Sequence, residues 1–234
     1  MSQDPLSIRV KWCQSLFGSC QWVWLEDDLV GEQNHWDDIY RRKAANQVSW
    51  FRPHLELSLR FIENAGLSRD AAIIDVGGGA STLVGDLIAQ GYSNITVLDI
   101  SESAIASAKS RLGMAAEVVH WIVSDITSVD LPQHGYDFWH DRAVFHFLRD
   151  AEMRRRYIAA VRWGLRPHGH IVVATFGPGG PERCSGLDVV RYCANGLHAE
   201  FGDPFTKVAS SSQIHTTPWG TEQEFVYCHC RMTC

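Results

Sequence analysis

Apolar and polar positions change their period several times along the chain, and these changes predict an alternating α/β order. Short apolar runs, of the length of a buried strand, alternate with stretches of helical period between about residues 72 and 176. The predicted strands of this region cover 72–76, 94–98, 118–123, 137–140 and 170–176, and the predicted helices cover 81–90, 102–112 and 150–163. Such alternation at short spacing is typical of a parallel sheet with helices on both faces.

The flanking segments complete the expected fold. Two helical segments precede the first strand, a turn or two at 35–40 and an amphipathic helix at 54–64. A helix at 187–201 and two strands at 206–215 and 223–231, joined by the turn-forming stretch 216–220, follow the last parallel strand. We therefore expect a doubly wound, mostly parallel seven-stranded sheet that ends in an antiparallel hairpin. The expected domain covers 34–234, with 1–33 as an extension of unknown role.

Composition narrows the class of protein. A chain of 234 residues is long enough for one α/β domain with a sizeable core. It carries 21 Lys and Arg against 27 Asp and Glu, and no basic stripe dominates, so a nucleic acid is not expected as a partner. No run approaches the roughly 18 uncharged apolar residues that a membrane span requires.

The cysteines show no disulfide framework. There are seven, an odd number at irregular spacings, so a reducing cytoplasm is the expected location. Cys228 and Cys230 flank His229, and residues of these types can bind a metal ion. On a terminal strand they would share one face while His229 points to the other, which disfavours a common ion. No metal site is expected.

The stretch 72–81 organises the rest of the chain, because it predicts a buried strand, a tight glycine turn and a helix. In open α/β sheets a nucleotide-like cofactor binds at this junction, and glycines let the backbone approach it closely. Thr82 stands where a G-x-G-x-x-G dinucleotide fingerprint has its third glycine, which disfavours a NAD site. The form D-x-G-x-G-x-S, opening with Asp75, suits a cofactor whose ammonium end meets a carboxylate.

Two acidic residues follow the next predicted strands. Asp99, 22 residues beyond Gly77, ends the second strand, and a carboxylate there can accept both hydroxyls of a ribose diol. The alternative is a carboxylate that caps the following helix. Asp125 and Ile126 follow the third strand, where the carboxylate can accept the adenine amino hydrogens while Ile126 packs on the ring.

With these motifs the chain resembles the class I S-adenosylmethionine-dependent methyltransferases. The resemblance covers about residues 35–231 and rests on the motifs Asp75-Val76-Gly77-Gly78-Gly79, Leu98-Asp99, Asp125-Ile126, Tyr136-Asp137-Phe138-Trp139 and Leu165-Arg166-Pro167-His168-Gly169. It implies S-adenosyl-L-methionine as cofactor and transfer of its methyl group to a nucleophile. The residues that it implies for cofactor binding are Trp36, Trp50, Asp75, Gly77, Gly78, Gly79, Asp99, Ile100, Asp125, Ile126 and Arg142.

The acceptor side is less defined. Asp141-Arg142-Ala143 is similar to the thiopurine methyltransferase group, which often acts on thiols and related soft nucleophiles, whereas an Asp-Lys-Gly-Thr form marks protein-lysine methyltransferases of this fold. The segments 36–40 and 50–51 resemble the aromatic lids of both groups. We expect a small-molecule acceptor, with a soft nucleophile favoured over others. The alternatives are a protein-lysine methyltransferase, a non-catalytic cofactor-binding scaffold and a NAD-dependent reductase.

Methyl transfer from a sulfonium requires alignment of the nucleophile, exclusion of water and, where necessary, removal of a proton. Asp141 and His146 are the predicted catalytic residues for proton removal, with His140 as a further candidate. Arg142 holds either the cofactor carboxylate or a substrate anion. Cys184, on the loop after the fifth strand, either contacts the acceptor or is a buried structural thiol.

Overall fold

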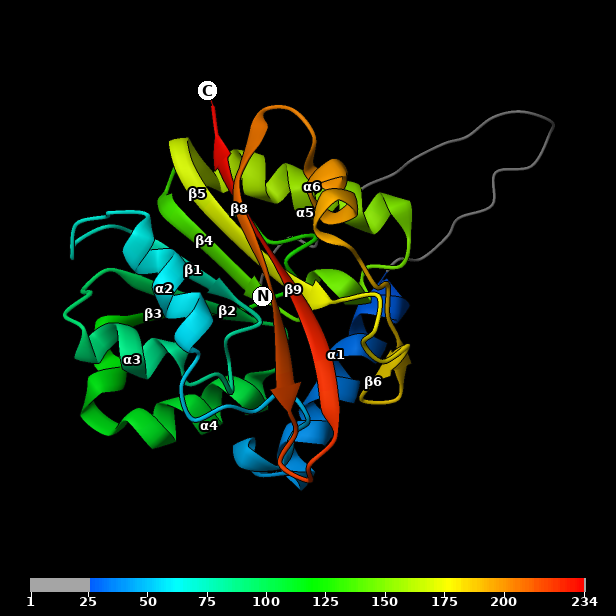
Figure 1. Cartoon of the computed structure of the whole chain (residues 1–234). Helices are drawn as coiled ribbons and strands as arrows, with labels where there is room; N and C mark the ends of the chain where they lie inside the picture. Colours follow the sequence, from blue (N-terminus) through cyan, green and yellow to red (C-terminus); the bar gives the residue numbers. More distant parts are fainter. Residues whose placement is uncertain (1–25, 234) are drawn as a thin grey trace, which may run out of the picture.

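A computed structural model describes residues 26–233 of the chain, with side chains from residue 32 onward (Figure 1). Its helices are α1 (Glu26–Arg42), α2 (Glu56–Asn64), α3 (Leu83–Ala89), α4 (Glu102–Leu112), α5 (Ala151–Gly164) and α6 (Ala194–Phe201), with short 3-10 helices η1 (Ala45–Gln47), η2 (Gly113–Val118) and η3 (Phe145–Phe147). Its strands are β1 (Ile73–Val76), β2 (Ile95–Asp99), β3 (Val119–Val123), β4 (Tyr136–Arg142), β5 (Leu165–Phe176), β6 (Arg183–Cys184), β7 (Leu187–Asp188), β8 (Phe205–Thr216) and β9 (Glu222–Met232).

The central sheet has the strand order β3-β2-β1-β4-β5-β9-β8. The first five strands in this order pair in parallel, while β9 runs antiparallel to both β5 and β8. The predicted doubly wound sheet with a terminal antiparallel hairpin is therefore confirmed. In the described part of the chain a separate two-stranded sheet, β6–β7, forms a small hairpin.

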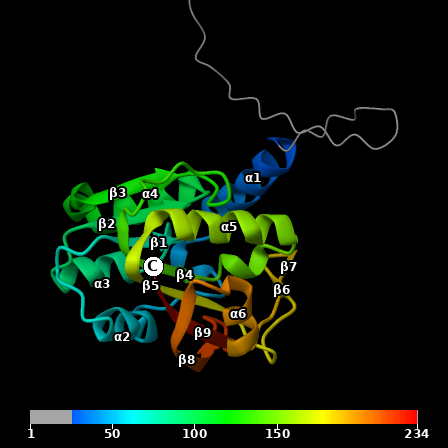
Figure 2. The ribbon, with the colours of Figure 1, turned by 90° about the horizontal axis from the view of Figure 1, so that it is seen from above.

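Helices cover both faces of the sheet, which explains why the inner strands are apolar throughout. Ile73 of β1 and Val172 of β5 pack with Leu83 of α3 on one face, which α2 also covers. Their chain neighbours face the other way, so Ile74 packs with Tyr157 of α5 in a second core that α6 also covers. Figure 2 shows α5 and the pair α2 and α3 on opposite sides of the sheet.

Helix termini follow the local signals of the sequence. Ser101 Oγ accepts a hydrogen bond from Ala104 N (3.1 Å) and caps α4, which ends at Gly113 with φ +57°. Asp150 caps α5 in the same way, through Glu152 N (2.7 Å). The bounds predicted for α4 are confirmed.

Several predicted elements differ from the structure. Strand β5 begins at Leu165 rather than at residue 170, and β4 extends to Arg142 rather than to residue 140. The helix predicted over 187–201 is wrong in its first half, because β7 occupies its start and α6 begins only at Ala194. Backbone N–H groups of Val190 and Tyr192 donate to carbonyls of His146 and Phe176, which holds this stretch against η3 and β5. The helix predicted at 35–40 is much longer, since α1 has 17 residues.

Helix α1 crosses the predicted boundary between residues 33 and 34, and residues 1–25 of the predicted extension lie outside the described residues. On β9 the predicted alternation is confirmed. Cys228 and Cys230 face the core beside α5 and α6, while the His229 ring meets Phe61 of α2 on the opposite face. No helix of the described region has the length and apolar character needed to cross a bilayer.

Candidate active site

A cavity lies at the carboxyl ends of β1, β2 and β4, and its space, including the part open to solvent, is about 770 Å³. Here the strand order reverses on either side of β1, the position where open α/β sheets bind ligands. The lining side chains and backbone belong to Glu32, Trp36, Tyr40, Trp50, Val76, Gly77, Leu98, Asp99, Ile100, Ser124, Asp125, Ile126, Arg142, Ala143, Val144, Phe147, Leu148 and Cys184.

Asp99 points toward the glycine turn from the end of β2. Its Oδ2 accepts a hydrogen bond from Gly79 N (2.9 Å) and its Oδ1 accepts one from Ser101 N (2.8 Å). Burial raises the pKa of Asp99 to about 6, although both hydrogen bonds act to lower it. The carboxylate is thus fixed at the cavity wall and has lone pairs left for further donors.

Asp125 and Ile126 line the same end of the cavity as Asp99, beside Ile100. The Asp125 carboxylate accepts from Thr127 N (2.7 Å) and from Thr127 Oγ1 (2.9 Å), which fixes its orientation. Ile126 is buried and offers an apolar surface. The structure therefore brings the three predicted elements of an adenosine site to one end of one cavity.

The glycine turn leaves no room for side chains. A Cβ at Gly77, where φ is +68°, would collide with Val144, and one at Gly78 would collide with the Asp75 carboxylate. A Cβ at Gly79 would lie 2.7 Å from Asp99 Oδ2. Gly77 lines the cavity, whereas Gly78 and Gly79 make the close packing of backbone against Asp75 and Asp99 possible.

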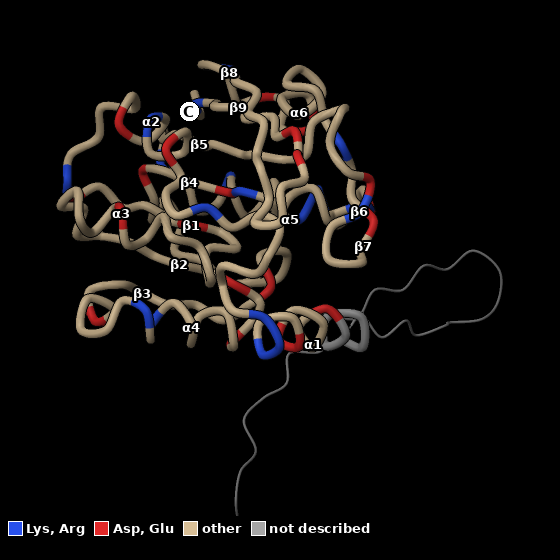
Figure 3. Tube along the Cα trace, turned by 60° about the horizontal axis from the view of Figure 1, so that its bottom comes forward, with Lys and Arg blue, Asp and Glu red and all other residues tan. Residues whose placement is uncertain are grey.

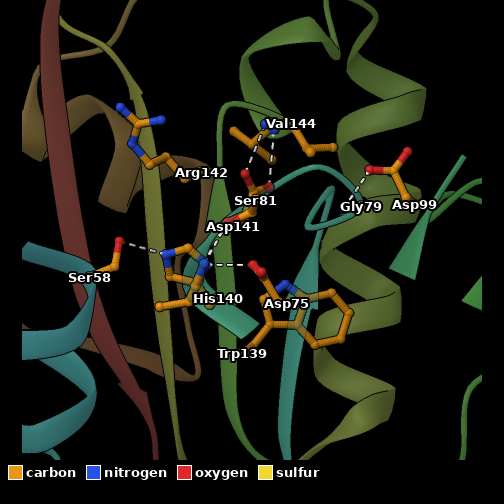
Figure 4. A network of polar contacts seen from close by, with 12 residues as sticks. Ser58, Asp75, Gly79, Ser81, Asp99, Trp139, His140, Asp141, Arg142 and Val144 are labelled. Carbon is orange, nitrogen blue, oxygen red and sulfur yellow. Dashed lines mark hydrogen bonds and ion pairs between the residues drawn. The ribbon is translucent and has the colours of Figure 1, made fainter. Parts of the chain in front are cut away.

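Asp75 lines a second, smaller cavity of about 440 Å³ that shares Trp50, Gly77 and Arg142 with the first. The His140 ring holds Asp75, since Nδ1 lies 2.7 Å from Asp75 Oδ1 and Nε2 lies 2.8 Å from Ser58 Oγ (Figure 4). Asp75 Oδ2 is buried without a hydrogen-bond partner. A buried carboxylate oxygen of this kind suits the ammonium group of a ligand.

Arg142 lies between the two cavities, at the end of β4. Its Nε donates to Tyr227 Oη (3.1 Å), its Nη1 donates to Trp50 O (2.9 Å), and Cζ lies 4.2 Å above the Phe225 ring. Its Nη2 is buried without a partner. The side chain thus anchors the segment around Trp50 and brings a positive charge close to both cavities.

Aromatic rings form the remaining wall. The Trp36 ring of α1 lies 5.9 Å from the Trp50 ring and 5.0 Å from the Phe147 ring, and Tyr40 lies 6.3 Å from Trp50. Burial raises the pKa of the Tyr40 hydroxyl well above its usual range and that of the Cys184 thiol to about 11. Both groups are therefore neutral at physiological pH.

The two predicted catalytic residues lie outside the cavity lining. Asp141 is fully buried and accepts hydrogen bonds from Val144 N (2.9 Å), Phe145 N (3.1 Å) and Tyr157 Oη (2.7 Å). Burial raises its pKa to about 6 against these hydrogen bonds. Because Ala143 has φ +75°, we assign Asp141 a positioning role, in which it braces the turn after β4.

His146 is also fully buried, with Phe147 and Phe176 against its ring. Its Nδ1 accepts a hydrogen bond from Phe176 N (3.3 Å). Burial and the charge of Arg142 lower its pKa to about 3, so the ring is neutral. We therefore assign His146 to the join between η3 and β5, away from proton transfer.

The sequence prediction missed two kinds of residue. Phe147 and Leu148 enter the cavity because η3 follows β4 directly, and the apolar run after Arg142 was the available signal. Tyr157 positions Asp141 from 16 residues away on α5, and Trp139 Nε1 in turn donates to its hydroxyl (3.0 Å). That contact has no local signal, because it depends on how α5 packs on the sheet.

The geometry defines a class of protein: an α/β enzyme whose cavity fits a nucleoside cofactor with an amino-acid end. Gly77 contributes backbone without a side chain, Asp99 a carboxylate held by Gly79 N, and Asp75 a buried oxygen without a partner. No cluster of three or more His, Cys, Asp or Glu suited to a metal occurs within residues 26–233.

Comparisons with known proteins agree with this class. A family model described as a methyltransferase domain matches residues 73–169. EEF1A lysine methyltransferase 2 of Danio rerio is 23% identical over 160 residues, which cover 62% of this chain and 69% of that protein. The match to a methyltransferase domain, set in this fold, identifies an S-adenosylmethionine-dependent methyltransferase that uses S-adenosylmethionine as its cofactor.

Two solved structures illustrate the likeness of fold. One, from work on conversion of a disulfide bond into a thioacetal group during echinomycin biosynthesis, has a TM-score of 0.70 at 18% identity and covers 86% of this chain and 92% of that chain. The other is Burkholderia thailandensis 1,6-didemethyltoxoflavin-N1-methyltransferase with its substrate and S-adenosylhomocysteine. It has a TM-score of 0.60 at 22% identity and covers 90% of this chain and 88% of that chain.

Proposed function

We propose that this methyltransferase acts on the side-chain amine of lysine in a protein substrate. This proposal departs from the small-molecule acceptor that the Asp141-Arg142-Ala143 motif favours. The name of the relative from Danio rerio, an EEF1A lysine methyltransferase, supports it. The observation that carries it in the structure is the aromatic half of the cavity, formed by Trp36, Tyr40, Trp50 and Phe147.

This aromatic half suits a lysine side chain. Its rings offer apolar surface for the four methylene groups, and aromatic faces attract an ammonium, by about 0.5–2 kcal/mol depending on desolvation. Glu32, an exposed carboxylate of α1, stands at the rim. A cationic side chain would therefore meet a negative charge before it reaches the rings.

The cofactor supplies an activated methyl group on a sulfonium. We propose that Asp99, with Ile100 beside it, holds the ribose, that Asp125 and Ile126 hold the adenine, and that Asp75 with the turn Gly77-Gly78-Gly79 holds the amino-acid end. Trp36, Trp50 and Arg142 would close the site and exclude water. The hydrogen bonds of Asp99 and Asp125 and the unpartnered oxygen of Asp75 support these roles.

An amine must lose its proton before it can attack. Tyr40 and Cys184 are neutral in the cavity and are weak proton acceptors in that form. Loss of water around the amine and the nearby positive charge of Arg142 lower the pKa of an entering ammonium, against the cation–π attraction of the rings. We therefore propose that the environment deprotonates the lysine, with the proton leaving to solvent rather than to Asp141 or His146.

A small-molecule acceptor with a soft or amine nucleophile is the second candidate. The likeness in fold to the toxoflavin methyltransferase, whose structure contains its small substrate, supports it. The buried Arg142 Nη2 without a partner also fits an anionic acceptor better than a lysine.

Radiolabelled S-adenosylmethionine tests the two candidates together. We expect label in protein bands of a cell extract and, after hydrolysis, in N-methyl-lysine; EEF1A is a first substrate to try, and such a partner would agree with a cytoplasmic location. Label confined to the small-molecule fraction would refute the lysine proposal and support the second candidate. Binding of cofactor without turnover in either fraction would indicate a scaffold. Asp99→Ala serves as the control for enzyme-dependent label.

A further inference from the structure

Asp37 of α1 is a buried carboxylate that accepts hydrogen bonds from the start of another helix, while Arg41 of α1 lies 3.6 Å from its Oδ2. Its Oδ1 accepts hydrogen bonds from Ser101 Oγ (2.7 Å) and Ser103 N (3.0 Å), at the N-terminus of α4. Burial acts to raise its pKa, but the hydrogen bonds from Ser101 and Ser103 outweigh this and lower it. Asp37 is therefore an ionised side chain that ties α1 to α4, and Figure 3 shows the two helices side by side.

Ser101 links this tie to the cavity. Its Oγ donates to Asp37 while its backbone N donates to Asp99 Oδ1 (2.8 Å), and Asp99 Oδ2 accepts from Gly79 N (2.9 Å). A continuous chain of hydrogen bonds therefore runs from α1 to the glycine turn. A displacement of Asp37 would remove a charged partner from the same serine that orients Asp99.

The helix that Asp37 holds carries one wall of the cavity. Trp36 precedes Asp37 in the chain and Tyr40 follows one turn later, and both line the cavity. Both rings contact Trp50, and Trp36 also contacts Phe147, edge to face across separate segments of the chain. Movement of α1 would therefore open the cavity without disrupting the sheet.

We propose that Asp37 is a positioning residue that holds α1 closed over the bound cofactor and couples this closure, through Ser101, to the carboxylate of Asp99. The inference rests on the proposed role of Asp99 as the ribose-binding residue. It assigns to α1 the control of cofactor release. With Asp37 removed, the closed helix loses its charged contact to α4, so the cofactor escapes faster while its entry is little changed.

Stopped-flow tryptophan fluorescence with S-adenosylhomocysteine tests this, because it separates association from dissociation. Asp37→Ala is expected to raise the dissociation rate constant about tenfold and to leave the association rate constant within twofold. Asp37→Asn retains an acceptor oxygen for Ser101 and should raise dissociation by less than about threefold. Asp38→Ala is the matched control, because Asp38 is the next residue, is exposed and pairs only with Arg41 and Arg42 among the ion pairs of the described chain.

A release rate of Asp37→Ala equal to that of Asp38→Ala would overturn the proposal, and so would a loss of affinity that lies entirely in association. Hydrogen exchange of the wild-type protein gives a second test that no folding defect can obscure. We expect S-adenosylhomocysteine to slow exchange of the α1 amides around Asp37; unchanged exchange there would also refute the proposal. If the wild-type protein binds no S-adenosylhomocysteine, the proposed cofactor site is refuted. That outcome differs from one in which the cofactor binds but Asp37 has no effect on its release.

Discussion

Replacement of Asp99 by alanine is the most direct test of the cofactor site. The carboxylate would accept two ribose hydroxyls, and a hydrogen bond to a charged group contributes about 1.5–3 kcal/mol. Loss of both corresponds to about 3–6 kcal/mol, or roughly a hundredfold to ten-thousandfold weaker binding. Isothermal titration calorimetry with S-adenosylhomocysteine at pH 7.5 measures this loss. We expect a dissociation constant at least a hundred times that of the wild type.

The same substitution also leaves Gly79 N and Ser101 N without their acceptor, so a folding effect must be separated from the binding effect. Asp70→Ala, at an exposed turn before β1, is the control for loss of an acidic residue. A ligand without the diol, 2′,3′-dideoxyadenosine, provides the cross-check, because Asp99→Ala should weaken adenosine far more than this analogue. Affinity for S-adenosylhomocysteine within threefold of wild type, in a variant that melts normally, would refute the site.

Three further predictions concern the residues around Asp99 and the turn after β4. The pKa of Asp99 is raised to about 6, so its carboxylate is ionised above that pH and the affinity for S-adenosylhomocysteine should fall as the pH drops from 7 to 5. Asp99→Asn should remove this dependence. A wild-type affinity that calorimetry finds unchanged across this range would contradict the prediction. Gly79→Ala should weaken cofactor binding at least tenfold, because the new Cβ would lie 2.7 Å from Asp99 Oδ2. Gly85→Ala is the control and should bind the cofactor normally in the same titration, because its Cβ would meet only Leu112, at 3.5 Å. Asp141→Asn should lower the free energy of unfolding, measured in urea, by about 1–3 kcal/mol, because buried partners such as Tyr157 lose a charged acceptor. The same variant should change kcat less than threefold. A hundredfold fall in kcat with unchanged stability would restore the predicted catalytic role of Asp141.

Much of the fold was open to prediction because its signals are local. The apolar run 72–76 and the capping pair Ser101 and Gly113 define β1 and α4 by short-range chemistry alone. The stretch 187–193 was not predictable in this way. Its backbone hydrogen bonds go to His146 and Phe176, which lie far away in sequence, and those partners hold it out of a helix.

In the candidate site, too, some features follow from local sequence signals and others from long-range packing. Asp75, Gly77, Asp99 and Asp125 lie at or just after the carboxyl ends of β1, β2 and β3. These ends meet at one edge of a parallel sheet, so the convergence of the four residues follows from the order of elements in the sequence. Asp141 and His146 also end up beside this edge, yet their side chains turn into the core. Only packing decides that orientation, because Tyr157 of α5 and Phe176 of β5 occupy the directions in which the two side chains point.

The sequence by itself thus determined the sheet, most of its helices and the positions of the acidic and glycine residues that we propose hold the cofactor, since each depends on neighbours within a few residues. Only the tertiary structure decided which residues reach the cavity from a distance. Trp36 and Tyr40 reach the cavity from α1, which Asp37 ties to α4, and Cys184 reaches it from the β6–β7 hairpin. Contacts between segments far apart in the chain have no local pattern, and they form the aromatic wall of the cavity.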